Sequence, residues 1–524
     1  MSDEEKKSLE VEETQEEINE EPVQEEEIKE EAPQEETPVE ESVEAETAVE
    51  DIQEEPAKED EVPAKKKKKR IRRKDMTPEQ KKKRRIKDII ISVAVIGTVG
   101  ILLAIFAIAG YAGNKTNRKM ITQLEKVGTT YQMGENLKLE QYGDASYYTF
   151  TTPTISSEFK VLQLTDIHIG AGAFCISNDN WAINAVAKMV KDVKPDLVIV
   201  TGDIGYPVPF QSGTFNNLRE AETFAELMEQ LGVYWAHVYG NHDTELYSLY
   251  DRKELSDLVY LKKDKYPHCL FQIGPDDIAG YGNYIVNVKN PLGLITQSFV
   301  LVDSHAYTDG DYFGIAWKYD NIHQDQIDWY EKEINKLNTM NKATYATLTA
   351  AQKTEYALAT AQDLAAVELK FNDPNAMTIK SSMYFHIPLT EYKDVWDEYV
   401  ASGYQKVGSD YEFKMGIGGE AGKVVYCGMH DDNVFETIQK LKSTTHVFCG
   451  HDHYNNFSIE YWGKNGNKET DWGVTLTYSL SIDYLAMPGI AKKYEQRGGT
   501  IIKVSSAGDL ALSQRKLIDI EQGK

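Results

Sequence analysis

The feature that most constrains this 524-residue chain is an uncharged run of 24 residues, 89–112. As a helix the run would be about 36 Å long, which is enough to cross a hydrocarbon core of about 30 Å. A helix with no polar face is not typical of a soluble protein. A cleaved signal peptide is the alternative, because residues 107–109 resemble a small-x-small cleavage site, but its apolar part is usually shorter and nearer the N-terminus. We therefore predict one transmembrane helix over residues 89–112.

A basic segment, residues 65–88, precedes this run. Residues 65–87 hold 15 Lys and Arg against two acids, whereas the other flank has only Lys115, Arg118 and Lys119 nearby. Positive charge collects on the cytoplasmic side of membrane helices. The flanks thus predict a single-pass protein of the cell membrane, with a cytoplasmic N-terminus and an extracytoplasmic domain. A basic run alone can indicate nucleic-acid binding, but beside a spanning helix it indicates topology and contact with anionic lipids.

Residues 1–64 form an acidic tail. Residues 1–62 contain 28 Asp and Glu, four Lys and no aromatic residue. Such a segment cannot bury enough apolar surface to offset its ordering entropy, so we predict that it is disordered. It is either a solvated spacer or a docking tail for a basic partner. The chain beyond the basic segment is also acidic, so we expect no nucleic-acid partner.

The rest of the chain alternates apolar runs with amphipathic stretches, which is typical of an α/β domain. We expect a linker and leading strand over residues 113–157 and the domain over 158–524, with a helical insertion at about 342–370. The predicted strands are 161–165, 196–201, 233–239, 284–288, 299–303, 383–386 and 446–449. The predicted helices are 180–192, 216–231, 324–336, 390–401 and 433–441. After residue 453 a strand-rich region, 457–503, predicts a second, mostly antiparallel sheet.

Five polar clusters follow the predicted strands. They are Asp166-Ile167-His168, Gly202-Asp203, Gly240-Asn241-His242-Asp243, His386 and Gly450-His451-Asp452-His453. Side chains at i and i+2 of an extended chain point to the same side, so the Asp-x-His and His-x-His pairs should each lie side by side. The carboxyl ends of strands are where α/β sheets place ligand sites. Nitrogen and oxygen donors without Cys suit Mn, Fe or Zn, and the donors suffice for two metal ions.

This ordered set of motifs, within LQLTDIHIG, DLVIVTGDIGY, YGNHDTE and FCGHDHYNNF, resembles the calcineurin-like metallophosphoesterase superfamily and its purple-acid-phosphatase-related branch. The resemblance covers roughly residues 158–465. It implies two packed mixed β-sheets flanked by helices, a metallophosphoesterase-like sandwich, and two divalent or trivalent metal ions.

The resemblance also implies a role for each motif residue. One metal ion would be held by Asp166, His168, Asp203 and His453, and the other by Asp203, Asn241, His386 and His451, with Asp203 bridging. A metal-bridging hydroxide would attack the phosphorus. His242 would be the catalytic residue that stabilises the transition state and protonates the leaving oxygen.

Tyr206 departs from this pattern. In the protein-phosphatase branch an Asp at this position orients the His of G-N-H. In purple acid phosphatases a Tyr here ligates ferric iron, but their first motif lacks the His of D-x-H. Because His168 is present, we favour His168 as the ligand and give Tyr206 a supporting or structural role. The residue that orients His242 stays open, with Asp243 as a candidate.

These features predict a membrane-anchored dinuclear-metal phosphoesterase that hydrolyses a phosphate ester. One alternative is a membrane-tethered binding or scaffold protein whose phosphoesterase-like domain is inactive. Another alternative is a cytoplasmic adaptor, in which the acidic tail and the basic segment carry the function. Monoesters, diesters, nucleotides and phosphoproteins all remain possible substrates, and the acidic domain favours phosphomonoesters over polyanionic polymers. The sequence does not determine the oligomeric state, and four Cys allow three disulfide pairings.

Overall fold

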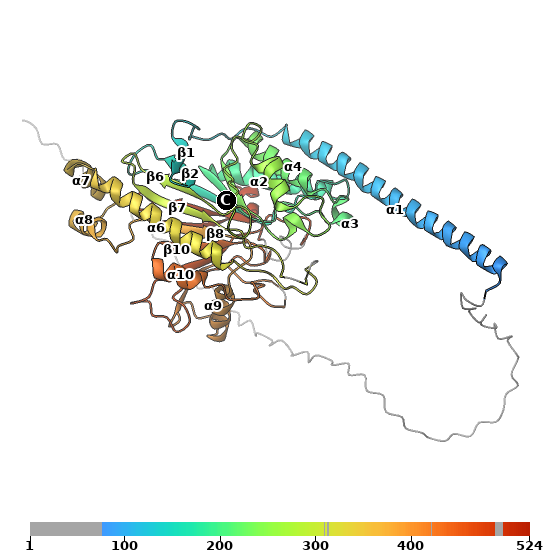
Figure 1. Ribbon diagram of the computed structural model, residues 1–524. Coiled ribbons are helices and arrows are strands. Elements are labelled where there is room, and N and C mark those ends of the chain that lie inside the picture. The colour runs from blue at the N-terminus through green and yellow to red at the C-terminus, as the bar shows by residue number, and fades with distance from the viewer. Residues whose placement is uncertain (1–75, 309, 312–313, 421, 488–495) are drawn as a thin grey trace, which may run out of the picture. The chain divides into compact units, whose positions relative to one another are not determined.

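The computed structural model describes residues 76–308, 310–311, 314–420, 422–487 and 496–524. The predicted acidic tail and residues 65–75 of the basic segment lie outside these residues. Helix α1 (Pro78–Ile121) contains the whole uncharged run (Figure 1). Among the described residues it is the one helix that is long and apolar enough to cross a membrane, a test that a signal sequence also passes.

The strands form two mixed sheets. In the described part of the chain, the larger has nine strands in the order β1-β2-β6-β7-β8-β10-β12-β11-β9, and the smaller has five in the order β14-β13-β3-β4-β5. The strands of the larger sheet, in that order, are Leu137–Tyr142, Ala145–Thr151, Tyr284–Lys289, Ile295–Leu301, Ser381–Tyr384, Thr444–Cys449, Val474–Tyr478, Ser458–Tyr461 and Tyr411–Met415. Those of the smaller sheet are Leu510–Lys516, Gly498–Val504, Phe159–Leu164, Leu197–Thr201 and Trp235–Val238.

The two sheets pack face to face, and helices cover their outer faces (Figure 1). One core cluster joins side chains of both sheets, such as Leu162 and Phe299, to the apolar faces of α2 (Ile176–Val193) and α4 (Asn217–Leu231). A second cluster lies between the larger sheet and α6 (Gln324–Ala346), α9 (Thr390–Ala401) and α10 (Val434–Leu441). This arrangement confirms the predicted fold class.

Five shorter α-helices also lie in the described part of the chain. They are α3 (Pro209–Ser212), α5 (Arg252–Leu255), α7 (Ala350–Ala359), α8 (Leu364–Asn372) and α12 (Leu517–Glu521). Helices α7 and α8 bury Tyr356 and Phe371 with Tyr345 of α6 in a small cluster of their own. All four cysteines, which lie in the described part of the chain, are free.

The expected separate sheet after residue 453 is wrong. Strand β12 pairs in parallel with β10, and β11 pairs with β12, so both extend the larger sheet. Strands β13 and β14 form a hairpin that adds to β3 of the smaller sheet. The local pattern shows that a segment is a strand, but the choice of partner depends on which sheet edge is open in the folded domain.

Candidate functional site

The polar clusters meet where five strands end. Strands β3, β4 and β5 run parallel in the smaller sheet, and β8 and β10 run parallel in the larger one. Each motif begins within three residues of its strand's last residue, so all five come together at one edge of the sandwich.

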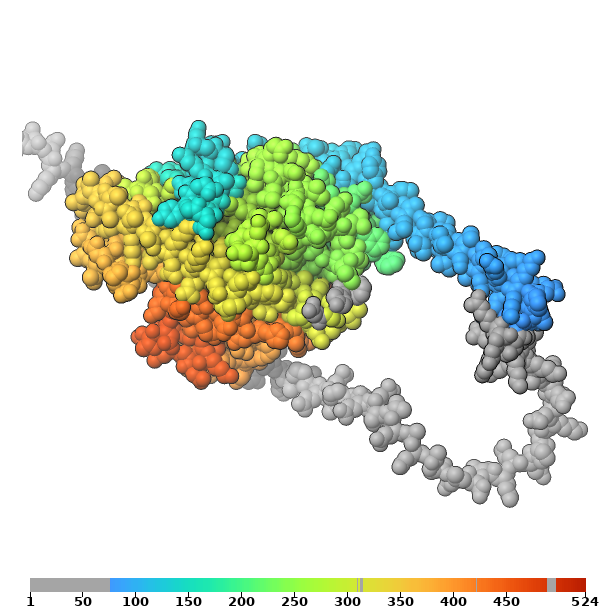
Figure 2. All heavy atoms as spheres, in the orientation of Figure 1, coloured from blue at the N-terminus to red at the C-terminus, as the bar shows by residue number. Residues whose placement is uncertain are grey.

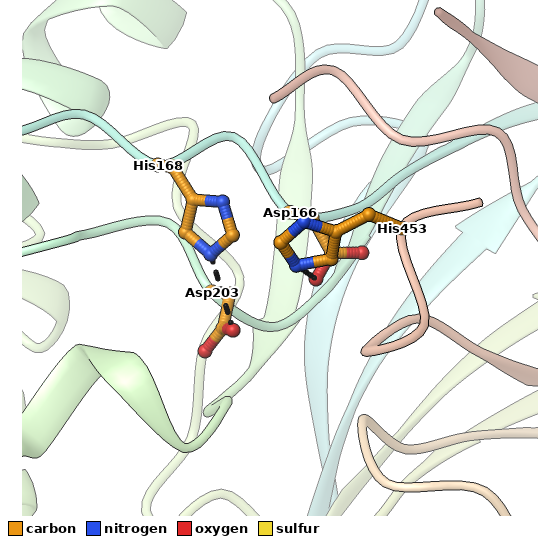
Figure 3. Close-up of side chains that lie close together, drawn as sticks. All are labelled: Asp166, His168, Asp203 and His453. Atoms are coloured by element: carbon orange, nitrogen blue, oxygen red, sulfur yellow. Dashed lines mark hydrogen bonds and ion pairs between the residues drawn. The ribbon is translucent and has the colours of Figure 1, made fainter. Parts of the chain in front are cut away.

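Four of the predicted ligands form a tight buried group, shown in Figure 3. The potential ligand atoms of Asp166, His168, Asp203 and His453 all lie within 4.8 Å of one another. Nε2 of His168 is 3.2 Å from Oδ2 of Asp203, and Nε2 of His453 is 3.4 Å from Oδ1 of Asp166. This group has the composition expected for one metal site.

The remaining predicted ligands lie on the other side of Asp203. Nε2 of His386 is 3.3 Å from Oδ2 of Asp203 and 3.1 Å from Oδ1 of Asn241. The rings of His386 and His451 are 5.2 Å apart between centroids. His386 Nδ1 donates to the Thr201 carbonyl at 2.7 Å, which leaves Nε2 facing the site. The Asp203 carboxylate therefore lies between the two groups, as a bridging ligand would.

The backbone that carries these ligands is not extended, so the predicted reason for their proximity is wrong. Asp166, His168, Asp203 and His451 have φ values between 50° and 78°, in the left-handed region that L residues rarely adopt. Strand β3 ends at Leu164, and the Asp-x-His pair lies in the loop beyond it. The side chains converge because each loop turns sharply after its strand, not because of strand alternation.

His242 lies beside this cluster and is oriented by Glu245. Its backbone N–H donates to Oδ1 of Asp203 at 2.8 Å, and its Nδ1 is 2.7 Å from Oε1 of Glu245. The His242 side chain is 27% exposed, whereas that of Glu245 is 3% exposed. Tyr307 also donates its hydroxyl to Glu245, at 3.0 Å. The i, i+3 spacing of His242 and Glu245 was the sequence signal that could have identified this partner.

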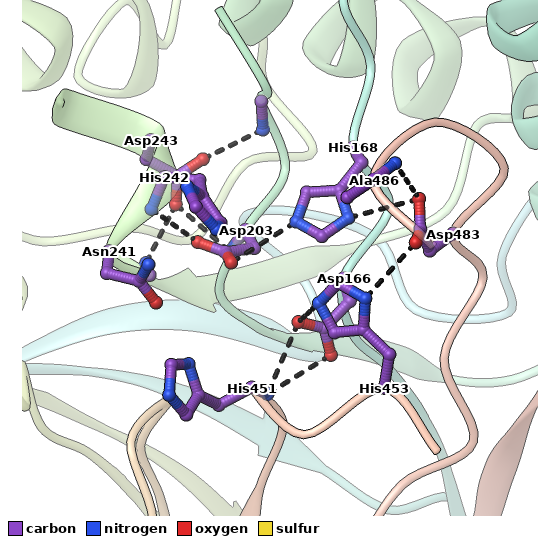
Figure 4. A network of polar contacts seen from close by, with 12 residues as sticks. Asp166, His168, Asp203, Asn241, His242, Asp243, His451, His453, Asp483 and Ala486 are labelled. Atoms are coloured by element: carbon purple, nitrogen blue, oxygen red, sulfur yellow. Dashed lines mark hydrogen bonds and ion pairs between the residues drawn. The ribbon is translucent and has the colours of Figure 1, made fainter. Parts of the chain in front are cut away.

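Asp243, the predicted candidate for that role, instead joins the loops of the site. Its Oδ2 accepts the backbone N–H groups of Asp203 at 3.1 Å and Gly240 at 2.8 Å, and its Oδ1 accepts that of Gly205 at 2.9 Å. The carboxylate thus fixes the loop after β5 to the loop after β4, as Figure 4 shows. The ring of Tyr206 packs edge-on against the rings of His168 and His242, each at 5.0 Å between centroids.

Sequence reasoning missed Asp483. Its Oδ1 is 3.2 Å from Nδ1 of His168, and its Oδ2 is 3.1 Å from Nδ1 of His453 (Figure 4). One carboxylate thereby orients two imidazoles and leaves both Nε2 atoms for the site. The backbone N–H groups of Leu485 and Ala486 each donate to Oδ1 at 2.8 Å. No motif marks Asp483, because His168 lies more than 300 positions away in the chain and His453 lies 30 positions away.

The charge balance of the site favours a cation. Burial disfavours ionisation of Asp203, but His386, His242 and His168 hold the pKa of its carboxyl well below the usual value. Burial lowers the pKa of His386, yet Asp203 and Asp166 raise it to about 9. The buried carboxylates thus favour the protonated, positively charged form of His386. A metal ion can supply that charge instead, so the donor set fits a metal centre.

The chain is similar to known phosphoesterase-like proteins. The family described as calcineurin-like phosphoesterase matches residues 159–347. "Probable inactive purple acid phosphatase 14" of Arabidopsis thaliana is 26% identical over 329 residues, which are 59% of this chain and 68% of that protein. "Probable inactive purple acid phosphatase 29" of the same plant is 24% identical over 60% of this chain and 71% of its own. "Phosphatase DCR2" of Saccharomyces cerevisiae is 26% identical over 58% of this chain and 46% of its own.

Among solved structures, a dimetal phosphatase from Danio rerio aligns with 68% of this chain and 96% of its own chain, at 11% identity and a TM-score of 0.38.

Proposed function

We propose that the domain hydrolyses a phosphate ester with two bound metal ions. The premise is that residues 159–347 match the calcineurin-like phosphoesterase family. The observation that carries the proposal is the convergence of the other six predicted ligands around Asp203, with the partly exposed His242 beside them. We propose phosphomonoesters as the substrate class.

The proposed ligands are those that the motifs indicate. One metal ion would be held by Asp166, His168, Asp203 and His453, and the other by Asp203, Asn241, His386 and His451. The ions, when bound, would stabilise charge on the phosphoryl oxygens and activate water. Mn, Fe and Zn all suit these donors.

His242 is the proposed general acid. Its side chain is more exposed than the buried ligands around Asp203, so it can meet a substrate that approaches the cluster from solvent. Glu245 accepts a hydrogen bond from Nδ1–H of His242. Nε2 is then free to deliver a proton to the leaving oxygen. The buried Glu245 carboxylate also stabilises the protonated imidazolium of His242, as the Asp of a catalytic triad stabilises its His.

A second candidate function is binding without catalysis. Two of the relatives named above carry the word "inactive" in their names. In that case the domain would bind a phosphorylated ligand without hydrolysing it. The complete ligand set and the His242–Glu245 pair favour the catalytic function.

The membrane anchor is part of the proposal. Helix α1 would span the bilayer over residues 89–112, with the N-terminus cytoplasmic and the domain of residues 158–524 extracytoplasmic. The basic segment before it would contact anionic lipids.

The test is metal content and hydrolysis by the full chain in lipid nanodiscs, with p-nitrophenyl phosphate and bis-p-nitrophenyl phosphate. We expect about two metal ions per chain and a preference for the monoester. Asp203→Asn should lose metal and activity. His242→Ala should keep the metal and lose about 10²–10⁴-fold in kcat, and Glu245→Gln should lose less.

The matched control is His430→Ala, because His430 is exposed and lies outside the cluster. A wild type that stays free of metal and inert after incubation with Mn, Fe and Zn would contradict the catalytic proposal. A wild type that binds metal and a phosphorylated ligand without turnover would favour the binding function.

A further inference from the structure

Helix α1 does not end where the uncharged run ends. It continues to Ile121, and one of its faces is buried against the domain. The buried residues follow helical spacing and are Phe106, Ala109, Gly110, Gly113, Asn117 and Ile121. The contact therefore begins inside the run that would span the membrane. Figure 2 shows this part of α1, in blue, against the domain surface.

Two glycines let the helix approach the domain closely. A Cβ at Gly110 would lie 2.3 Å from the Arg219 guanidinium, and one at Gly113 would lie 2.3 Å from the Gly172 carbonyl carbon. In contrast, a Cβ at Gly97 or Gly100, earlier in the run, would meet nothing within 4 Å.

Polar contacts fix the turn that follows. Asn117 is fully buried and donates to Oδ2 of Asp179 at 2.6 Å. Arg118 pairs with Glu222 at 3.1 Å and with Glu226 at 2.8 Å. The domain is thus held by a packed helix, and not by a free linker.

Four phenylalanines cluster where the run meets the domain. The ring of Phe106 lies 6.4 Å from Phe174, 5.8 Å from Phe210 and 5.1 Å from Phe215, between centroids. Phe106 itself is 8% exposed, but Phe174 is 53% and Phe210 81% exposed. Phe174 lies in the loop that follows the Asp166–His168 motif, and Phe210 lies in the short helix α3 that follows the Asp203 motif. We call Phe106, Phe174, Phe210 and Phe215 the phenylalanine cluster.

The position of Phe106 along the helix sets the depth of this cluster. With a rise of 1.5 Å per residue, Phe106 lies about 26 Å along the helix from Ile89, the first residue of the run. A hydrocarbon core of about 30 Å would still contain Phe106, just inside its far edge. The rings that touch Phe106 would then lie at the interface between hydrocarbon and headgroups, where membrane proteins concentrate aromatic side chains.

We propose that the domain rests on the bilayer through the phenylalanine cluster, with Phe174 and Phe210 inserted among the lipids of the adjacent leaflet. The proposal rests on the membrane anchor of the proposed function. The bilayer is the partner because the cluster is continuous with the spanning segment through Phe106. The consequence is that the loops of the metal cluster are held at the membrane surface.

The test places a fluorophore at the cluster in the full chain. Phe210→Cys, in a Cys427→Ser background, is labelled with an environment-sensitive dye in nanodiscs that contain lipids with a nitroxide near the headgroup. Cys175, Cys269 and Cys449 are buried, which limits labelling to position 210. Ile96→Cys reports the anchor, and Leu358→Cys is the water-exposed control, because these side chains are 71% and 76% exposed. Phe174→Cys repeats the measurement at a second position.

We expect quenching at position 210 to reach at least half of that at position 96, and position 358 to show none. If position 96 is quenched while positions 210 and 174 behave like position 358, the anchor stands and the docking is overturned. If position 96 is not quenched, the anchor itself fails and the docking fails with it. A blue-shifted but unquenched dye at position 210 would mean that protein covers the cluster, which would also overturn the contact with lipid.

Discussion

At the scale of single residues, the site depends on backbone conformations that are unfavourable in isolation. Four of the seven predicted ligands have positive φ, and none of the four is glycine. Each such residue costs of order 1–3 kcal/mol and persists only where the surroundings determine it. Here the surroundings include Asp243, whose carboxylate accepts two backbone N–H groups from the loop after β4 and one from its own loop. The same bonds that fix the strained loops also fix the ligands that they carry.

Asp483→Asn should weaken metal binding without removing a ligand. The asparagine keeps one oxygen for the backbone N–H groups of residues 485 and 486, but it lacks the negative charge and the second oxygen that face Nδ1 of His168 and His453. Loss of such supporting partners typically costs about 10–100-fold in metal affinity. Competition titration with a chromophoric chelator measures this change. Asp509→Asn, at an exposed position, is the control, and equal affinities in both variants would contradict the role of Asp483.

Glu220 makes stability depend on pH. Its side chain is fully buried beside the loop that carries Asp203, and burial, Asp179 and Asp243 raise the pKa of its carboxyl well above the usual 4.5. The unfolded chain releases this proton near pH 4.5 while the folded chain keeps it, so stability falls as pH rises above 4.5 toward the folded pKa. Each unit of difference corresponds to about 1.4 kcal/mol.

Glu220→Gln should remove this dependence, because the amide carries no titrating proton. We expect the Tm of the variant to exceed that of the wild type at pH 8, and the gap to shrink toward pH 5. Thermal unfolding across this range measures it, with the exposed Glu355→Gln as the control. A gap that is constant with pH would show that Glu220 is ionised in the folded chain.

The sequence alone identifies ligands better than it identifies the residues that support them. Asp166, Asp203 and His453 stand in short motifs after apolar runs, so their convergence could be predicted. Asp483 could not be assigned in this way, because its partners lie far away in the sequence, and Glu245 was marked only by its i, i+3 spacing from His242. The strained backbone was equally invisible, since the residues that adopt it are not glycines.

At the scale of elements, strands were predictable and their partners were not. The apolar runs before each motif correspond to β3, β4, β5, β8 and β10. One leading strand was expected within residues 113–157, whereas the structure has two, β1 and β2, and the apolar signal of β1 is weak because only Leu137 is buried. Strands β11 and β13 were expected, but they pair in different sheets. Pairing depends on contacts that form only when segments distant in sequence meet.

Helix α1 combines two environments in one element, and its glycines distinguish them. Gly113→Ala places a Cβ against the backbone of Gly172, whereas Gly97→Ala meets open space. We expect Gly113→Ala to lose about 1–3 kcal/mol through overpacking, which would lower the Tm of the domain. Gly97→Ala should leave the Tm unchanged. Thermal unfolding of both variants in nanodiscs checks this, and equal Tm values would mean that α1 does not pack on the domain.

At the scale of the whole molecule, the cluster of predicted metal ligands joins the two sheets. Asp166, Asp203 and Asn241 follow strands of the smaller sheet, and His386 and His451 follow strands of the larger one. A ligand that binds groups from both layers stabilises their packing as well as its own site. Occupancy of the proposed metal sites and the stability of the sandwich should therefore be coupled at this edge.

Removal of metal should consequently loosen both sheets together. We expect chelation to lower the Tm of the metal-loaded full chain, since a ligand at 100 times its Kd stabilises the folded state by about 2.7 kcal/mol. Amide hydrogen exchange should show lower protection at the ends of β3 and β4 and at the ends of β8 and β10 in the same step. Asp203→Asn, which lacks the proposed bridging carboxylate, should show neither change on chelation. Loss of protection at the ends of β3, β4 and β10 without loss at the end of β8 would mean that His386 holds no metal, and that the site is mononuclear.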